Sequence, residues 1–217
     1  MSMFGPSGSR MKIVIATRNS HKRAELKRLL TPLGEGVVSL EELDPRGEIP
    51  EVEETGTTLK ENAFLKARAI FKATGLPAVS DDTGLEVEVL DGAPGVNSAR
   101  YAGENCSYED NINKLLQEMV FVPPYQRKAS FRTVAAFVDD ELELSAEGAV
   151  EGVITEKPEG FGGFGYDPVF SVENMKKSYA QLSDDEKNRI SHRGKAVRNL
   201  VEKLRQNGKI AEPLSNI

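Results

Sequence analysis

The chain has 217 residues, of which 39% are hydrophobic and 29% are charged, a composition typical of globular cytosolic proteins. Its formal net charge of −6 argues against a general nucleic-acid binder, because such proteins need a basic surface. No apolar run approaches the ~20 residues that span a bilayer, and the single cysteine, Cys106, excludes an internal disulfide. We therefore expect a cytoplasmic protein with neither nucleic acid nor membrane as a partner.

The first ten residues are rich in Gly, Ser and Pro and lack the apolar stretch of a signal peptide. We expect residues 1–10 to be a disordered leader or a cloning remnant, with Met11 as the natural start. The remaining length is sufficient for a sizeable core. We expect residues 11–217 to form a single domain.

The opening segment predicts a strand, a polar loop and a helix. Residues 12–16 read Lys-Ile-Val-Ile-Ala, which is typical of a short buried strand. A polar loop follows at residues 17–22. Beyond it, four leucines recur on one face of a predicted helix: Leu26, Leu29, Leu30 and Leu33.

A second helix is marked by its two ends. Thr58 and Glu61 have the spacing of a capping box, and Gly75 stands where a C-terminal cap belongs. Further along, a run of alternating residues indicates a half-buried strand that ends at a turn at Asp91–Gly92. We expect a strand, a polar loop and this second strand at residues 78–80, 81–84 and 85–89.

The second half of the chain predicts three helices and a long hairpin. The first helix is capped by Ser107 and ends at the Val122-Pro123-Pro124 segment. The hairpin covers residues 127–150 and turns at residues 139–140. A glycine-rich loop at residues 160–165 precedes two closing helices, one capped by Ser183 with Glu186 and one after Arg193. These elements predict a mixed α/β fold with a second lobe around the hairpin.

Three polar residues meet at the first strand-to-helix junction. In Thr17-x-Asn19-x-x-Lys22, a hydroxyl, an amide and an ammonium join the free N–H groups of a helix start, which favour anions. Phosphate binding is one interpretation. The alternative is a simple turn, with Ser20 as the helix cap.

Asp81 and Asp82 directly follow a buried strand, which places two carboxylates at its end. Mg²⁺ is usually held by one or two carboxylates together with substrate phosphates. The alternative is an Asx turn in which Gly84 supplies the flexible position. Because such a turn needs one Asp, the pair favours a functional site.

Two further polar segments favour solvent exposure. Glu51, Glu53 and Glu54 form an acidic run that is typical of a solvated loop. Asn62 and Lys66 share one face of the following helix, and surface exposure is the simpler interpretation of that face.

The glycine-rich loop and the last helix junction complete the candidate set. Glycines let a backbone approach a ligand, and an aromatic side chain such as Phe164 can stack on a base. The alternative is a tight turn whose phenylalanines fill the core. Lys187 and the Ser191-His192-Arg193 segment lie near a break between two helices, where N–H groups lack helical partners.

Taken together, these segments resemble the inosine/xanthosine triphosphate pyrophosphatase family, also called Ham1-like. The similarity runs from Met11 to about Leu204. It rests on residues 17–22, Glu54-Thr55-Gly56 with Glu61-Asn62, Ser80–Leu85, Pro94–Tyr101, Gly162–Pro168 and Glu186–Arg193. The resemblance implies an elongated α/β fold with a mixed central sheet, flanking helices and two lobes around a substrate cleft. It also implies a homodimer.

The resemblance further implies a role for each matching residue. Mg²⁺ would be held by Glu54 and Asp82, and Asp82 would also activate the attacking water. The triphosphate would be held by Thr17, Arg18, Asn19, Ser20, His21, Lys22 and Lys66. Base, sugar and phosphate would be held by Thr83, Phe164, Gly165, Tyr166, Asp167, Lys187, His192 and Arg193. Thr83 stands where Ser is common and keeps the hydroxyl, and Asn97 stands where an aromatic residue is common.

The implied reaction is hydrolysis of ITP, dITP or XTP to the monophosphate and pyrophosphate, by attack at the α-phosphorus. Two other functions are compatible with parts of the pattern. One is a pyrophosphatase for modified pyrimidine or methylated nucleotides. The other is a non-catalytic triphosphate sensor, although binding alone would not need Glu54, Asp82 and Lys187 together.

Overall fold

The computed structural model describes residues 12–30, 36–173 and 175–210. The expected leader at residues 1–10 and the predicted helical residue Leu33 lie outside these ranges. Across the described ranges, no helix is both long enough and apolar enough to cross a membrane.

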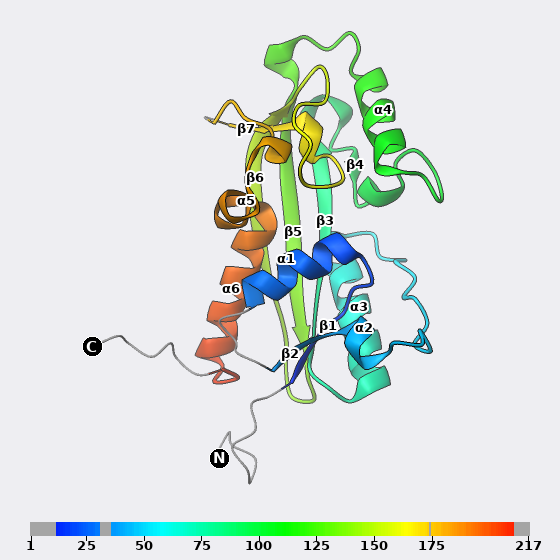
Figure 1. Ribbon diagram of the computed structural model, residues 1–217, viewed down its shortest axis with the longest axis vertical. Helices are drawn as coiled ribbons and strands as arrows, with labels where there is room; N and C mark the ends of the chain where they lie inside the picture. The colour runs from blue at the N-terminus through cyan, green and yellow to red at the C-terminus, as the bar shows by residue number, and fades with distance from the viewer. Residues whose placement is uncertain (1–11, 31–35, 174, 211–217) are drawn as a thin grey trace, which may run out of the picture. The chain divides into compact units, whose positions relative to one another are not determined.

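A mixed sheet is the central element of the fold (Figure 1). In the described part of the chain its strands are β1 (Ile13–Ile15), β2 (Val37–Ser39), β3 (Ala78–Val87), β4 (Pro94–Gly95), β5 (Lys128–Val138), β6 (Glu143–Ile154) and β7 (Phe170–Val172). Their order is β2-β1-β3-β5-β6-β7, with β4 paired to β3. β1 is parallel to β2 and β3, whereas β4 runs antiparallel to β3, and β7 to β6.

Helices flank this sheet, so the predicted mixed α/β fold is confirmed. The α-helices in the described ranges are α1 (Ser20–Leu30), α2 (Leu40–Leu43), α3 (Leu59–Thr74), α4 (Tyr108–Glu118), α5 (Asp184–Ile190) and α6 (His192–Gln206). Short 3-10 helices occupy Glu88–Leu90, Ser98–Arg100, Pro124–Gln126, Asp167–Val169 and Tyr179–Gln181.

The chain divides into two compact units. The first contains the described residues up to Asp82, then Val134–Glu147 and the described residues from Ala196 onward. The second contains Thr83–Thr133 and Gly148–Lys195. β3, β5 and β6 therefore each contribute residues to both units. The expected single domain and its substrate cleft stay predictions.

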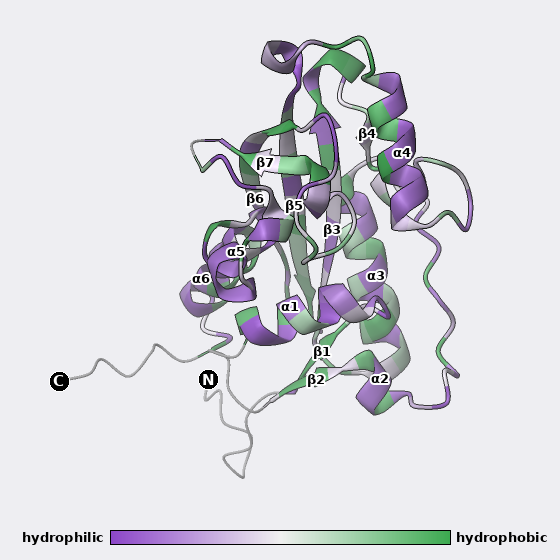
Figure 2. Ribbon diagram, turned by 45° about the horizontal axis from the view of Figure 1, so that its top comes forward, coloured by the Kyte–Doolittle hydropathy of each residue, from purple (hydrophilic) through white to green (hydrophobic). Residues whose placement is uncertain are grey.

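In the first unit, β1 is buried on both faces, which explains why its residues are all apolar. Ile13 and Ile15 pack with apolar residues of α1 and α6, whereas Val14 packs with Ile70 of α3. Two helices thus cover each face, α1 with α6 and α2 with α3 (Figure 1). In Figure 2, β1 is coloured hydrophobic, while α1 and α6 carry long hydrophilic stretches that match exposed faces.

Helix α1 is capped by Asn19, so the interpretation of Ser20 as the cap is wrong. The Asn19 side-chain oxygen accepts hydrogen bonds from the backbone N–H groups of His21 (3.0 Å) and Lys22 (3.1 Å). Ser20 is the first residue of the helix and is exposed. An Asn one residue earlier makes the same bonds to the N2 and N3 positions that a Ser cap would make.

Helix α3 confirms the predicted caps at both of its ends. Thr58 accepts a hydrogen bond from the Glu61 N–H, and the Glu61 carboxylate accepts one from the Thr58 N–H. Gly75 closes the helix in the left-handed conformation, with φ 67°. Ala63, Ala67 and Ile70 form the buried face. The helix thereby presents fixed side-chain positions beside the sheet.

The strand after α3 differs from the prediction. β3 is continuous from Ala78 to Val87, so residues 81–84 are neither a loop nor an Asx turn. The predicted second strand also ends earlier, because Glu88–Leu90 form a 3-10 helix before the Asp91–Gly92 turn. Asp81 and Asp82 therefore lie in the middle of a ten-residue strand, and not at its end.

The second unit has its own core, built from α4, β7 and parts of β3, β5 and β6. Ser107 caps α4 as predicted, and Ile112 and Leu115 face the core. The helix ends at Glu118, before the prolines that were expected to end it. The predicted hairpin is confirmed as β5 and β6, but β6 extends to Ile154 and pairs with β7, which the sequence pattern did not indicate.

The closing helices also follow their predicted caps. Ser183 and Glu186 form a capping box at the start of α5. α6 starts at His192, one residue before Arg193, so Ser191 stands at the junction between the helices.

We predict that Thr58→Ala lowers the free energy of unfolding by about 1 kcal/mol, because it leaves the Glu61 N–H without its cap acceptor. Urea unfolding followed by circular dichroism measures the change. Thr58→Ser is the matched control, because it keeps the hydroxyl and should unfold close to the parent. Equal losses in the two variants would contradict the capping role.

Candidate active site

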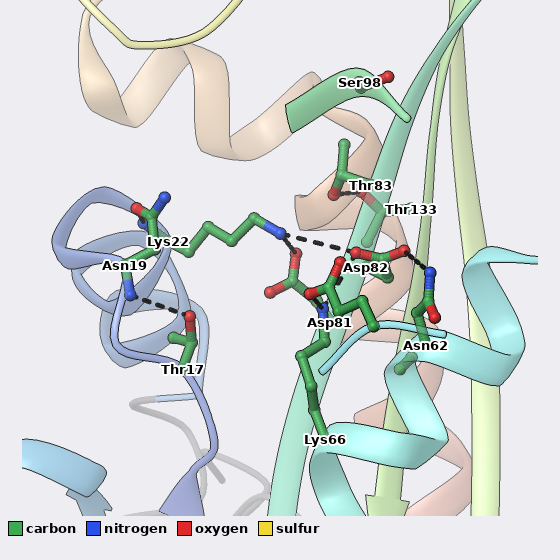
Figure 3. Close-up of polar contacts among 12 residues, drawn as sticks. Thr17, Asn19, Lys22, Asn62, Lys66, Asp81, Asp82, Thr83, Ser98 and Thr133 are labelled. Carbon is green, nitrogen blue, oxygen red and sulfur yellow. Dashed lines mark hydrogen bonds and ion pairs between the residues drawn. The ribbon is translucent and has the colours of Figure 1, made fainter. Parts of the chain in front are cut away.

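The middle of β3 carries two carboxylates that meet two lysines from different helices (Figure 3). Lys22 of α1 places its Nζ 3.8 Å from Asp81 Oδ2 and 4.0 Å from Asp82 Oδ1. Lys66 of α3 places its Nζ 3.0 Å from Asp82 Oδ1 and 2.6 Å from Glu54 Oε1. All five residues belong to the first unit. We call them the carboxylate–lysine cluster.

The carboxylate–lysine cluster is largely removed from water, since Asp82 is 4% exposed and Lys66 9%. Burial raises the pKa of Asp82, and the Glu54 carboxylate adds to this against the pull of Lys66 and Lys22. Burial alone would lower the pKa of Lys66, but Asp82, Glu54 and Asp81 together raise it. The two directions have different causes, because burial dominates for the Asp82 carboxyl and the three nearby carboxylates dominate for the Lys66 ammonium.

Asn62 ties the cluster to the segment that carries Glu54. It is fully buried, and its Oδ1 accepts a hydrogen bond from the Gly56 N–H (2.8 Å) while its Nδ2 lies 3.4 Å from Asp82 Oδ2. A Cβ on Gly56 would lie 2.6 Å from the same Oδ1, so a glycine is required there. The expectation that Asn62 and Lys66 are surface residues is wrong, because their helix face turns toward β3.

The residues of the Thr17–Lys22 loop differ in whether they reach the carboxylate–lysine cluster. The Asn19 N–H bonds the Thr17 hydroxyl (3.2 Å), which shapes the turn that starts the helix. Lys22 reaches the carboxylates, whereas Ser20 and His21 are exposed. Arg18 bonds Asp44 and the Ile49 carbonyl oxygen, each at 2.7 Å.

The glycine-rich loop of the second unit is organised by Asp167. Its Oδ2 accepts hydrogen bonds from the Phe164 N–H (2.8 Å) and from Lys187 Nζ (2.6 Å). The Asp167 carboxylate and the Lys187 ammonium are both buried, so the charge of each offsets the cost of burying the other. Gly163 has φ 70°, and a Cβ there would collide with the Asp167 carboxylate. The loop conformation therefore depends on the glycine and on the ion pair together.

Phe164 is the half-buried aromatic residue of this loop, and it lies beside two cations. Lys187 Nζ is 4.8 Å and Arg193 Cζ is 5.6 Å from the centroid of its ring. The Tyr108 ring of α4 approaches it at 6.0 Å between centroids. By contrast, Phe161 is fully exposed, so the interpretation of both phenylalanines as core residues is wrong for Phe161.

Arg193 is 2% exposed, which is unusual for a guanidinium group. Its Nη2 donates to the Thr83 hydroxyl (3.1 Å), and Thr83 in turn bonds the Thr133 hydroxyl (2.7 Å). The second unit therefore contains one guanidinium group hydrogen-bonded to a pair of threonine hydroxyl groups.

His192 and Tyr166 have structural partners in the second unit. The His192 ring stacks on Phe131, with centroids 4.5 Å apart and planes 13° apart, and Tyr179 extends the stack. The Tyr166 hydroxyl donates to the Ser98 carbonyl oxygen (3.0 Å), and burial raises the pKa of Tyr166. Gly165 adopts φ 61°, a conformation that suits glycine.

The donor set of the carboxylate–lysine cluster fits a hard divalent cation. Glu54 and Asp82 both approach the same Lys66 nitrogen, so two anionic oxygen donors face one position. Among the described residues, no group of three or more His, Cys, Asp and Glu side chains could hold a metal by itself. The two carboxylates of Glu54 and Asp82 fit the chemistry of Mg²⁺, which keeps several waters and binds through one or two carboxylates plus substrate phosphates.

Sequence reasoning missed several residues that the structure brings to these sites. Asn62 was named but expected at the surface, and Asp44 was missed, because each bonds a partner that is distant in sequence. Thr133 lies in a β-strand where a Thr carries no special signal. Tyr108 was missed because nothing in the sequence distinguishes the first helical residue after the cap Ser107 as a contact of Phe164.

Known proteins resemble this chain over most of its length. The model of the Ham1 family matches residues 13–203. A Thermoanaerobacter pseudethanolicus protein named dITP/XTP pyrophosphatase is 49% identical over 190 residues, covering 88% of this chain and 94% of that protein. An Escherichia coli K12 protein of the same name is 46% identical over 197 residues, covering 89% and 98%.

Solved structures give the same result. The Staphylococcus aureus Ham1 protein has a TM-score of 0.78 at 41% identity, covering 90% of this chain and 99% of that one. A HAM1 protein from Coxiella burnetii has a TM-score of 0.80 at 42% identity, again covering 90% and 99%. From the family model, the sequence identities and these structures, the chain belongs to the Ham1 family.

Proposed function

We propose that the protein hydrolyses non-standard purine nucleoside triphosphates, namely ITP, dITP and XTP, to the monophosphate and pyrophosphate. Such a reaction removes deaminated purines from the nucleotide pool. The observation that carries the proposal is the buried Asp82, which lies between Lys22, Lys66 and Glu54 in the middle of β3. The names of the 46–49% identical relatives support the substrate class.

We assign the triphosphate to the first unit. Lys22 and Lys66 supply positive charge, and the Thr17–Lys22 loop leads into the start of α1, where the helix dipole favours anions. Glu54 and Asp82 would hold Mg²⁺. When bound, the ion would offset negative charge on the phosphate oxygens during attack at the α-phosphorus.

Asp82 is the proposed general base. Its carboxylate is held between Lys66 Nζ on Oδ1 and Asn62 Nδ2 on Oδ2, so its orientation is defined. Burial raises its pKa, which makes it a better proton acceptor than an exposed aspartate. Water can then attack directly, and a covalent intermediate is not needed.

We assign base and sugar recognition to the second unit. Phe164 offers an aromatic face, and Thr83, Lys187 and Arg193 offer donors. His192 and the loop residues Gly165, Tyr166 and Asp167 complete the set. Hypoxanthine and xanthine present an acceptor at position 6, whereas adenine presents an amino donor. A buried donor facing that amino group would be left unpaired, which can reject a substrate by ~10⁴ or more.

We predict that Asp82→Asn retains the fold but lowers kcat for ITP about 10²-fold or more, because an amide is a poor base and a poor Mg²⁺ ligand. Pyrophosphate release measures turnover, and circular dichroism checks the fold. Glu54→Gln should show a smaller loss that high Mg²⁺ partly restores. Its matched control is the exposed neighbour Glu53→Gln, which should turn over like the parent. Asp82→Asn turnover within a few fold of the parent would refute this assignment.

We predict that Arg193→Ala lowers the ratio of kcat/KM for ITP over ATP by about one to two orders of magnitude, since a bidentate Arg–base pair gives ~1–3 kcal/mol of discrimination. Steady-state kinetics with both nucleotides on one preparation measures the ratio. Arg189→Ala, an exposed arginine on α5, is the control and should leave it unchanged. An unchanged ratio in a folded Arg193→Ala protein would show that the base is recognised elsewhere.

We also propose that the protein is a cytoplasmic homodimer, without nucleic acid or membrane as a partner. Light scattering at micromolar concentration should then give about twice the 23.8 kDa mass of one chain. A mass near that of one chain would contradict the dimer.

A further inference from the structure

Arg18 lies in the loop that we assign to the triphosphate, yet its side chain bonds protein groups outside that loop. The guanidinium Nη2 donates to Asp44 Oδ2 at 2.7 Å and to the Ile49 carbonyl oxygen at 2.7 Å. Both acceptors lie in the segment that follows α2, within the first unit. Arg18 therefore joins two loops that are 26 to 31 residues apart in sequence.

The Asp44 carboxylate, which accepts the hydrogen bond from Arg18, is buried and is held in place by backbone N–H groups. The residue is 8% exposed, and its carboxylate also accepts hydrogen bonds from the backbone N–H groups of Glu48 (2.8 Å) and Ile49 (2.9 Å). These bonds, first that of Ile49 and then that of Arg18, hold the pKa of Asp44 below its ordinary value. The carboxylate thus organises residues 44–49 into a compact turn with Arg18 as one of its donors.

The two segments that this contact joins are each close in sequence to residues of the proposed site. On one side, Arg18 directly precedes Asn19, which caps α1 and fixes the first turn that carries Lys22. On the other side, residues 44–49 precede the segment that carries Glu54, whose carboxylate contacts Lys66. A contact that restrains both loops reduces the conformational entropy that substrate binding would otherwise have to remove.

We propose that Arg18 is a positioning residue that acts through Asp44 and holds the triphosphate loop in its binding conformation, and that it is not itself a ligand of the phosphates. This inference rests on the proposed function, and it changes the role that the family resemblance implies for Arg18. The contact restrains the Thr17–Lys22 loop in the absence of substrate, so that Asn19 and Lys22 are already in place when the nucleotide arrives.

A double-mutant cycle with Arg18→Ala, Asp44→Ala and the double variant tests the proposal in the full-length protein at saturating Mg²⁺. Each single variant should raise KM for ITP about tenfold and leave kcat within about threefold, because binding is affected and the chemistry is not. The double variant should be no worse than the more impaired single variant, since each single change already removes the Arg18–Asp44 ion pair. Parent-like KM in Asp44→Ala, or multiplied effects in the double variant, would overturn the proposal.

Arg23→Ala and Glu41→Ala form the matched control pair. Arg23 lies on α1, outside the loop that carries Arg18, and it pairs with the Glu41 carboxylate of α2. Both control variants should keep the parent KM, so an equal rise in KM would show that any lost ion pair near α1 has this effect.

Amide hydrogen exchange tests the Arg18–Asp44 contact without relying on enzymatic activity. Arg18→Ala should increase exchange at the Glu48 and Ile49 amides, whose acceptor Asp44 loses its guanidinium partner, while Arg23→Ala should leave both at the parent level. Unchanged protection in Arg18→Ala would overturn the inference regardless of kinetics. Absence of pyrophosphate release from the parent protein would instead refute the proposed function, and the exchange result would still decide whether Arg18 organises residues 44–49 through Asp44.

Discussion

Charge compensation in the middle of β3 is the constraint on which the first unit depends. Asp81 and Asp82 are adjacent in a buried strand, and an isolated buried carboxylate would cost several kcal/mol. Lys22 and Lys66 remove much of that cost, and they come from helices whose caps fix where each lysine points. Because burial of ion pairs adds little net stability, retaining this cluster is better explained by chemistry than by folding.

The second unit also buries a carboxylate, and a different lysine compensates its charge. Asp167 and Lys187 form a buried pair that also fixes the Phe164 backbone N–H. Phe164 in turn lies beside Lys187 and Arg193, so a single carboxylate holds the backbone of the aromatic residue and one of the two cations next to its ring. Loss of Asp167 would therefore disturb the whole group, which distinguishes its position from that of an ordinary surface aspartate.

Local signals in the sequence were sufficient for the starts of three helices. The capping boxes at Thr58 and Ser183 and the cap at Ser107 were predictable because every partner lies within a few residues. The path of β3 was not, because residues 81–84 favour a turn locally and the lysines that allow a strand come from elsewhere. For the same reason Asn62 looked like a surface residue. Most site residues were named through the family resemblance, and residue patterns alone left their roles open.

The most direct test of the proposed activity is kcat/KM of the parent protein for ITP, dITP, XTP, GTP and ATP, with pyrophosphate and inorganic phosphate detected separately. We predict pyrophosphate and the monophosphate as products, and a preference for ITP, dITP and XTP over ATP of ~10² or more in kcat/KM. Release of inorganic phosphate, or equal efficiency with ATP, would contradict this prediction.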